Sequence, residues 1–212
     1  MKNFVLTALT CVFAINLTFA QDNEIKLQQI SNNNKATIEQ TAKNDQVDVL
    51  QTGGNRNVAS IKQVAGQVRG DMSTNQDFYL EQNGADNRLT AVSAGIDNDV
   101  KAFQIGNDNR ATFDIRNNQK DQGARAELYQ QGRDNVATIK MVGRRNYLDA
   151  DQIGRDNNIT LQMEGGSAAH RATLRQDGNH NRMNVQQLGS SHDVSALQVG
   201  NHNVAILKQT NN

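Results

Sequence analysis

A six-residue pattern, Gln-x-Gly-x-x-Asn, recurs along this chain and constrains its fold more than any other feature. Two early copies depart slightly from it: Gln29 to Asn34 has Ser31 in place of Gly, and Gln51 to Asn57 is one residue longer. The other six copies follow at intervals of 22, 26, 22, 24 and 22 residues and begin at Gln82, Gln104, Gln130, Gln152, Gln176 and Gln198. Repetition at such a period is typical of solenoids and other repeat arrays.

A weaker copy of the pattern lies after each strong one, normally 11 residues further on. The weaker copies start at Gln40, Gln63, Ser93, Ile115, Met141, Met163, Gln187 and Gln209. The full unit is therefore two arcs of about 11 residues. We name the arc that starts at a strong copy the strict arc and the other one the variable arc, and we call the first residue of each arc its anchor.

Each arc also alternates between apolar and polar residues. The residues seven and nine after the anchor are apolar in every arc, as in Ala137 and Ile139 or Leu148 and Ala150. The residues six, eight and ten after the anchor are mostly polar or charged. A period of two indicates a strand with one buried face. The sequence thus predicts an all-β chain, a β-solenoid of about seven to eight coils with two strands per coil, each coil about 4.8 Å thick.

Stacked coils would place identical side chains in rows along the solenoid axis. Inward amides in such rows can donate to and accept from the coils above and below, which satisfies groups that are otherwise costly to bury. The predicted stacking residues are Gln29, Asn34, Gln51, Asn57, Gln82, Asn87, Gln104, Asn109, Gln130, Asn135, Gln152, Asn157, Gln176, Asn181, Gln198 and Asn203. Glycines permit positive φ where the chain reverses, and the predicted turn glycines are Gly53, Gly84, Gly106, Gly132, Gly154, Gly178 and Gly200.

The composition agrees with rows of hydrogen-bonded amides. The 212 residues include 28 Asn and 22 Gln but no Pro, whereas average usage of about 5% would give roughly ten prolines. An interior coil pairs its strands on both sides, so a residue without an N–H has no place in it. The formal net charge of zero excludes a strongly basic nucleic-acid surface and an acidic solvating tail.

The first twenty residues have the pattern of a secretory signal peptide. Lys2 supplies a positive charge, Phe4 to Phe19 is largely apolar, and Thr18-Phe19-Ala20 forms a small-x-small cleavage site. We therefore predict three parts: residues 1–20 as signal peptide, 21–28 as a short N-terminal segment, and 29–212 as the repeat solenoid. No other apolar stretch approaches twenty residues, so no membrane span is predicted.

The two arcs differ in regularity. The strict arc keeps its Asn in all eight copies, whereas the variable arc has Asp, Gln, Asn, Ala or His there and absorbs the insertions. These insertions are Gly66 to Asn75, Asn117 to Gly123 and Gly165 to Ala169. Because loops on one edge leave the opposite edge uniform, the strict edge is the better candidate for an assembly surface.

The repeat resembles the curlin repeat of curli subunits, secreted bacterial proteins that form functional amyloid fibres on the cell surface. The clearest matches are Gln130 to Ile139 and Gln198 to Leu207, and the resemblance extends from Gln29 to Gln209. Use of the motif in both arcs, with many Arg and Lys residues outside, is closer to the minor, nucleating type of subunit than to the major one. The chain is longer than familiar subunits, which have about five repeats.

The resemblance implies export of an unfolded chain through a curli-type secretion pore with accessory proteins, followed by templated folding outside the cell. It implies a self-polymer and other curlin subunits as partners, an extracellular location in a cell-surface fibre, and a role in adhesion, aggregation and biofilm matrix. Main fibre subunit and nucleator both remain open.

The open ends of a solenoid lead to the same expectation by a physical route. A solenoid that ends in water normally needs a capping element, yet the repeat continues to Gln209. Unpaired strand edges invite another copy of the same chain. We expect end-to-end stacking into a cross-β fibre, with charged outer rows limiting side-by-side clumping.

An alternative is a monomeric secreted solenoid that binds ice or a surface ligand through its regular outer face. An outward hydroxyl row, which fades at Asn184 and Ile206, would suit it: Thr37, Ser60, Thr90, Thr112, Thr138 and Thr160. Solvated β-formers on an exposed face explain the same row. Outer Arg and Lys residues, such as Arg144 and Arg145, could attract matrix DNA or polysaccharide.

Histidines recur at the repeat period. His170 and His192, and likewise His180 and His202, are 22 residues apart, so stacking would place each pair about 5 Å apart. Such pairs could share a metal or sense pH, or His could replace Asn as a stackable polar ring. We predict no resident metal, no cofactor and no catalytic residues, since the acids are scattered and no Ser-His-Asp arrangement has supporting context. The chain is thus not expected to be an enzyme.

Overall fold

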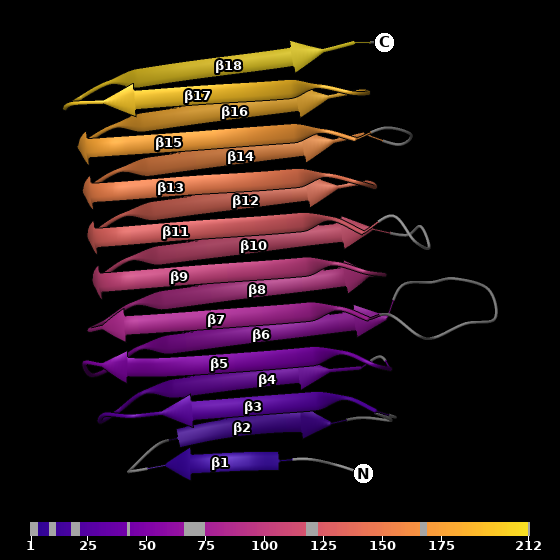
Figure 1. Ribbon diagram of the computed structural model, residues 1–212, viewed down its shortest axis with the longest axis vertical. Coiled ribbons are helices and arrows are strands. Elements are labelled where there is room, and N and C mark those ends of the chain that lie inside the picture. Colours follow the sequence, from indigo (N-terminus) through magenta and orange to yellow (C-terminus); the bar gives the residue numbers. More distant parts are fainter. Residues whose placement is uncertain are drawn as a thin grey trace.

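The computed structural model describes residues 4–8, 12–17, 22–41, 43–65, 75–117, 123–165 and 169–211, and its regular structure consists of strands stacked in a flat slab (Figure 1). The strands are β1 (Phe4–Ala8), β2 (Val12–Leu17), β3 (Glu24–Gln29), β4 (Lys35–Gln40), β5 (Gln46–Gly53), β6 (Val58–Ala65), β7 (Asp77–Gly84), β8 (Arg88–Gly95), β9 (Asp99–Asn107), β10 (Arg110–Asn117), β11 (Arg125–Arg133), β12 (Val136–Val142), β13 (Tyr147–Arg155), β14 (Asn158–Glu164), β15 (Arg171–Asn179), β16 (Arg182–Leu188), β17 (Asp193–Val199) and β18 (Val204–Thr210). No helix of the length and apolar character needed to cross a membrane occurs in this described part of the chain.

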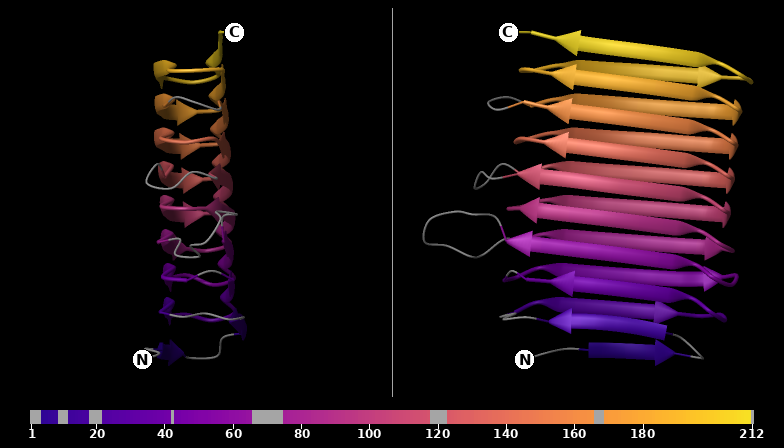
Figure 2. Two further views of the ribbon diagram at one scale, coloured as in Figure 1. Left: turned by 90° about the vertical axis from the view of Figure 1, so that its right-hand side faces the viewer. Right: turned by 180° about the vertical axis from the view of Figure 1, so that it is seen from behind.

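Odd-numbered and even-numbered strands form two separate parallel sheets. One sheet has the order β1-β3-β5-β7-β9-β11-β13-β15-β17, and the other runs from β18 through the even strands to β2. Each strand therefore pairs with the equivalent strand one coil away, and the two sheets face each other across a thin interior (Figure 2). The predicted β-solenoid with two strands per coil is confirmed.

The first two strands lie within the predicted signal peptide. β1 pairs with β3, which aligns Ala8 with Gln29, and β2 pairs with β4, which aligns Leu17 with Gln40. From β3 onward the chain forms eight coils, as the sixteen strands β3 to β18 define them. Cleavage after residue 20 remains a prediction.

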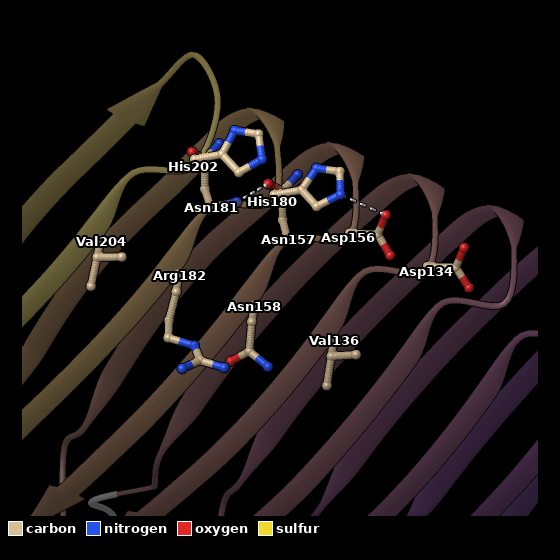
Figure 3. Close-up of a pocket in the computed structure, with 10 residues that line it drawn as sticks. All are labelled: Asp134, Val136, Asp156, Asn157, Asn158, His180, Asn181, Arg182, His202 and Val204. Carbon is tan, nitrogen blue, oxygen red and sulfur yellow. Dashed lines mark hydrogen bonds and ion pairs between the residues drawn. The ribbon is translucent and has the colours of Figure 1, made fainter.

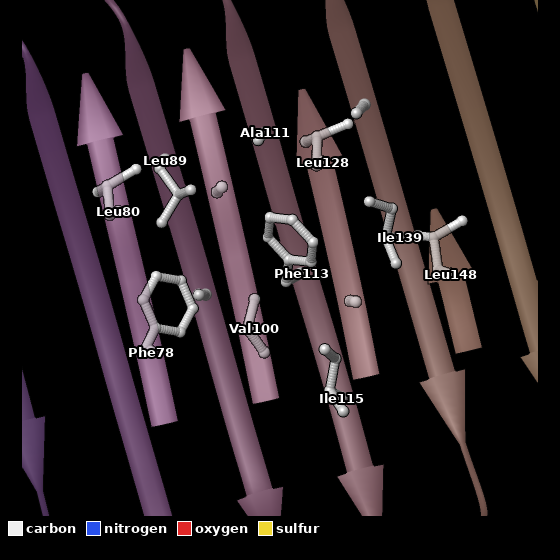
Figure 4. Packing of buried hydrophobic residues seen from close by; sticks show 14 of the residues in the cluster. Phe78, Leu80, Leu89, Val100, Ala111, Phe113, Ile115, Leu128, Ile139 and Leu148 are labelled. Carbon is white, nitrogen blue, oxygen red and sulfur yellow. The ribbon is translucent and has the colours of Figure 1, made fainter. Parts of the chain in front are cut away.

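The hydrophobic core is a single layer between the sheets. The apolar residues seven and nine after each anchor are buried, apart from Ala196, Ala205 and Leu207, which are partly buried in the last coil and pack against the others. Within a strand, a large inward side chain often has a small inward neighbour, as Phe113 has in Ala111 of β10 (Figure 4). This alternation fills the interior at near-constant thickness, since protein interiors are close-packed.

The turn glycines all have the positive φ that the sequence predicted, from 76° at Gly53 to 123° at Gly178. The stack adds a second requirement, because successive turns approach each other closely. A Cβ built on Gly132 would lie 2.0 Å from the carbonyl oxygen of Gly154. These glycines are therefore required both by the turn and by the next coil.

The insertions predicted for the variable arc fall between β6 and β7, β10 and β11, and β14 and β15. Most of their length, residues 66–74, 118–122 and 166–168, lies outside the described residues. Each joins an even strand to the next odd strand, so all three belong to the edge opposite the strict turns.

The turn geometry yields a prediction for two equivalent glycines. Gly132→Ala places its Cβ against the Gly154 carbonyl, whereas a Cβ at Gly200, which has a φ of 100°, meets nothing closer than Asn203 Nδ2 at 3.7 Å. Gly200→Ala thus costs only backbone strain, about 1–3 kcal/mol. We expect Gly132→Ala to lower the free energy of unfolding of the isolated chain by at least about 1 kcal/mol more, measured by urea unfolding. Equal losses would contradict a role for close contact between coils.

Candidate functional site: amide ladders and the ends of the stack

The strict-arc glutamines form an unbroken ladder of hydrogen bonds inside the solenoid. Each Nε2 donates to the Oε1 of the glutamine one coil further on, for instance from Gln104 to Gln130 at 2.9 Å and from Gln130 to Gln152 at 2.8 Å. At 2.5 to 3.1 Å the ladder joins Gln29, Gln51, Gln82, Gln104, Gln130, Gln152, Gln176 and Gln198. All eight side chains are buried, so the ladder supplies the partners that buried amides need.

The second hydrogen of the same amide group crosses to the other sheet. Gln130 Nε2 also donates to the backbone oxygen of Arg110 at 3.1 Å, and Gln152 Nε2 donates to that of Val136 at 3.0 Å. A single glutamine thus binds the next coil along the axis and the opposite sheet across the core. The ladder therefore holds neighbouring coils together along the axis and the two sheets together across the core.

The strict-arc asparagines bind the turn of the next coil. Asn109 Oδ1 accepts the backbone N–H of Asn135 at 3.2 Å, and Asn109 Nδ2 donates to the carbonyl oxygen of Gly132 at 3.1 Å. The same two bonds recur from Asn87 and Asn157. An aspartate would lose the second bond, because a carboxylate has no N–H to donate. This accounts for the Asn of the six interior strict arcs; Asn34 Nδ2 donates to Ser31 Oγ instead, and Asn203 Nδ2 donates to the backbone oxygen of Val199.

A second left-handed residue precedes each strict Asn, and the sequence reasoning missed it. Its φ lies between 55° and 64° at Asn33, Arg56, Asp86, Asp108, Asp134, Asp156, His180 and His202. Along the edge in Figure 3, Asp134, Asp156, His180 and His202 follow one another, with His180 Nε2 3.4 Å from Asp156 Oδ2. The available signal was residue type, since Asn, Asp and His are enriched at positive φ.

The variable arc performs the same acceptor task with different residues. Asp45 Oδ1 accepts the N–H of Gln76 at 3.2 Å, and Asn98 Oδ1 accepts that of Ala124 at 3.1 Å. His170 Nδ1 takes the same position and accepts the N–H of His192 at 3.4 Å. The position also holds Ala124, which has no side-chain acceptor, and Gln76, whose Nε2 donates to the backbone oxygen of Val64. The variable arc thus does not depend on one residue type at this position.

Both predicted histidine pairs are stacked. The ring centroids are 5.3 Å apart in His170–His192 and 4.9 Å apart in His180–His202, with interplanar angles of 14° and 13°. The Nδ1 contact of His170 favours the interpretation of this histidine as a ring that replaces Asn. The described residues contain no group of three or more His, Cys, Asp and Glu side chains that could hold a metal. Burial, and then the neighbouring His192, lowers the pKa of His170.

The variable-arc ladder is interrupted in the middle of the stack. Gln40 donates to Gln63 at 2.8 Å and Gln187 donates to Gln209 at 3.2 Å. Between these pairs the anchors are Ser93, Ile115, Met141 and Met163, all buried. An unbroken amide ladder is thus a property of the strict edge.

The two ends of the stack differ in hydrogen bonding. At the N-terminal side, Gln29 Oε1 and Gln40 Oε1 are buried with no hydrogen-bond partner among the residues that the structure describes, and the register aligns these glutamines with Ala8 and Leu17. Gln187 Oε1, which follows the break in the variable-arc ladder, is the other glutamine oxygen in this state among those residues. At the other end, Gln198 Nε2 donates to the backbone oxygen of Arg182 and Gln209 Nε2 to that of Asp193, and within the described ranges neither donates to a further glutamine. The last coil also carries exposed apolar side chains: Leu197, Val199, Val204 and Ile206. One end has acceptors in excess and the other has donors.

A comparison of the chain with models of known protein families, with curated proteins and with solved structures finds no match. The candidate site therefore rests on the geometry of the amide ladders and of the ends.

The ladder can be tested at its centre. Gln130→Leu leaves Gln152 Oε1, Arg110 O and one N–H of Gln104 without their side-chain partner, and each buried unsatisfied group costs about 1–3 kcal/mol. We expect the free energy of unfolding to fall by at least about 3 kcal/mol, measured by urea unfolding. Gln131→Leu, at the adjacent exposed position, is the control and should change it by less than about 0.5 kcal/mol. Similar values for both variants would rule out the ladder as a major source of stability.

The buried histidine predicts a pH dependence. Since the pKa of His170 in the folded chain lies below the value of about 6.5 for free imidazole, the unfolded chain binds the proton first as pH falls. Stability is therefore full above about pH 6.5 and decreases as the pH falls toward the folded pKa.

His170→Asn restores the Asn that other coils have at this position and should flatten this decrease between about pH 7 and 5. His180→Asn, at an exposed turn position that tolerates Asn as at Asn33, is the matched control and should retain the decrease. Denaturant midpoints across the pH range provide the measurement. A wild-type midpoint that stays constant over that range would refute the prediction.

Proposed function

We propose that this chain is a structural subunit of an extracellular, curli-type functional amyloid fibre, in which copies stack end to end along the solenoid axis. The observation that carries the proposal is the complementarity of the two ends: unpartnered buried acceptors at Gln29 and Gln40, and glutamine donors at Gln198 and Gln209.

The backbone of the last coil supports this proposal. The Arg182 N–H donates to the Asn203 carbonyl at 2.8 Å, so by the alternation along a parallel strand the N–H groups of Val204 and Ile206 point away from β16. The same reasoning applies to Asp193 and Ser195 in β17. A second copy in parallel register would receive these donors.

Continuation of the register defines the contacts between copies. Gln198 and Gln209 would donate to Gln29 and Gln40 of the next copy, and Asn203 Oδ1 would accept the N–H of its Asn34. These bonds repeat those that join neighbouring coils within one chain. The fibre would be polar, with the C-terminal coil donating. It also requires the edges of β3 and β4 to be free of β1 and β2, as removal of the predicted signal peptide would leave them.

A fibre of this kind would act outside the cell in adhesion, aggregation and biofilm matrix, either as the main subunit or as the nucleator of other curlin subunits. Export through a curli-type pore and accessory proteins belongs to the same proposal. Its basis is the repeat resemblance together with the open ends.

A second candidate, an ice-binding or ligand-binding monomer, draws on one observation. Thr90, Thr112, Thr138 and Thr160 are aligned in register along the even sheet, and Ser60 extends the row. The row then ends, because Asn184 and Ile206 take its place in β16 and β18. Thermal hysteresis of a soluble monomer would favour this candidate.

The fibre proposal can be tested by removing only the outward N–H groups. In residues 21–212, Ser195→Pro with Ile206→Pro deletes two donors on the free edges of β17 and β18 while sparing the bonds to β15 and β16. We expect wild-type protein to give fibres with reflections near about 4.8 and 10 Å, and the proline variant to fold but neither elongate nor extend wild-type seeds.

The control is Ser195→Thr with Ile206→Thr, which keeps both N–H groups and should elongate normally. Circular dichroism checks that the proline variant retains its β-structure. Wild-type protein that stays monomeric at high concentration, or a proline variant that elongates as fast as the control, would contradict end-to-end stacking.

A further inference from the structure

The charged side chains on the outside of the solenoid are sorted by sheet. Counting outward strand residues as far as the turns, the even sheet carries eight cations and three acids: Lys35, Lys62, Arg88, Arg110, Arg116, Lys140, Arg182 and Lys208 against Glu39, Asp114 and Glu164. Up to the turn glycines, the odd sheet carries five cations and ten acids: Lys26, Lys101, Arg125, Arg171 and Arg175 against Glu24, Asp48, Asp77, Glu81, Asp99, Glu127, Asp149, Asp151, Asp177 and Asp193. Arg133 and Arg155, which follow Gly132 and Gly154 at the ends of β11 and β13, add two cations at the strict edge and leave the acids in excess. A formal net charge of zero therefore conceals two faces of opposite sign.

Each of the three acids on the even face forms an ion pair with a cation of the same face. Lys62 pairs with Glu39 at 2.9 Å, Arg116 with Asp114 at 2.7 Å, and Lys140 with Glu164. Five cations on this face have no ion pair within the described ranges: Lys35, Arg88, Arg110, Arg182 and Lys208. The even face thus presents free positive charge.

The odd face, in contrast, carries mainly acids that have no ion pair. Its ion pairs are Lys26–Glu24, Arg125–Asp99 and Arg175–Asp177, and Arg171 lies over the ring of Tyr147 at 4.9 Å. Seven acids have no ion pair with any residue that the structure describes: Asp48, Asp77, Glu81, Glu127, Asp149, Asp151 and Asp193.

Acids of the odd face also repel one another along the stack. Asp77 aligns with Asp99, and Glu127 aligns with Asp149. Burial and the charge of Asp99 raise the pKa of Asp77, and burial and the charge of Asp149 raise that of Asp151. Cations brought against this face from outside would relieve the repulsion.

The faces also match in form. Both are parallel sheets whose strands repeat about every 4.8 Å, so rows on one solenoid stay in step with rows on another. The odd face adds a half-buried aromatic strip, Tyr79, Phe103 and Tyr129, with ring centroids 5.5 and 6.5 Å apart. The even face offers its flat hydroxyl row and half-buried Val92 and Val136. Such surfaces can bury apolar area as well as charge.

We propose that the even face of one solenoid docks onto the odd face of a second copy, so that neighbouring solenoids associate side by side through opposite charge. The sequence alone suggested that charged outer rows would keep fibres apart, whereas the sorting of the signs makes unlike faces attract. This association is distinct from end-to-end stacking and would operate between single solenoids or between whole fibres.

Two charge-reversed variants test the docking. The first, Arg88→Glu with Arg110→Glu and Arg182→Glu, makes both faces acidic. The second, Asp48→Lys with Asp149→Lys and Asp151→Lys, makes both faces basic. Each variant alone should form single fibres with at least a two-fold smaller mean bundle width than wild type in electron micrographs. A mixture of the two, preformed and separately labelled with gold, should bundle again and contain both labels side by side.

The control variant carries the same net charge change as the first variant but at the edges of the solenoid: Arg133→Glu, past Gly132 at the end of β11, with Arg144→Glu and Arg145→Glu between β12 and β13. It should bundle like wild type. Wild-type bundles should also disperse when salt is raised from about 0.05 to 1 M, since the Debye length then falls to about 3 Å.

Bundling by each single variant at wild-type width, or a mixture that stays separate, would overturn the proposal. So would loss of heparin or duplex DNA binding in the first variant with no change in bundle width, because the basic face would then serve a polyanion. If no fibres form, end-to-end stacking fails, and analytical ultracentrifugation of the two soluble variants, mixed and apart, still decides the docking of the faces.

Discussion

The fold depends on one interaction, the hydrogen bond that a buried side-chain amide makes with its counterpart in the next coil. A buried amide without a partner is costly, and the geometry that satisfies both of its hydrogens is found one coil away and across the core, as Gln130 illustrates. The chain must therefore keep the same register in coil after coil. The lack of proline and the glycine at each reversal follow from that requirement.

The two edges of the solenoid differ in how closely they restrict the residue that binds the next turn. On the strict edge, Asn uses both its oxygen and its nitrogen, so Asn109 cannot be exchanged without losing a bond to the next turn. On the other edge an acceptor alone is enough, and Asp45, Asn98 and His170 all supply one. The insertions fall on that edge, between even strands and the odd strands that follow them.

The outside of the molecule follows from the same repetition. A ladder that runs along the axis must stop somewhere, and it stops with free acceptors at one end and free donors at the other. Each sheet also carries a net charge of one sign, positive on the even face and negative on the odd face. Ends and faces are thus complementary in different ways, the ends through directional hydrogen bonds and the faces through long-range charge. The first favours polar growth along the axis and the second favours association across it.

Strands of the repeat region, the two sheets, the core positions and the rows of Gln, Asn and Gly could be predicted from the amino-acid order, because a period of two within a period of about eleven leaves little freedom in the fold. β1 and β2, within the predicted signal peptide, were not expected. The amino-acid order also did not reveal the left-handed residue before each strict Asn, the cross-sheet bond of Gln130, or the use of His170 Nδ1 as an acceptor. Those features depend on which atoms meet between coils. The tertiary structure alone decided which charges on each face neutralise one another, because side-chain reach as well as row position selects the ion pairs, as in Lys62 with Glu39.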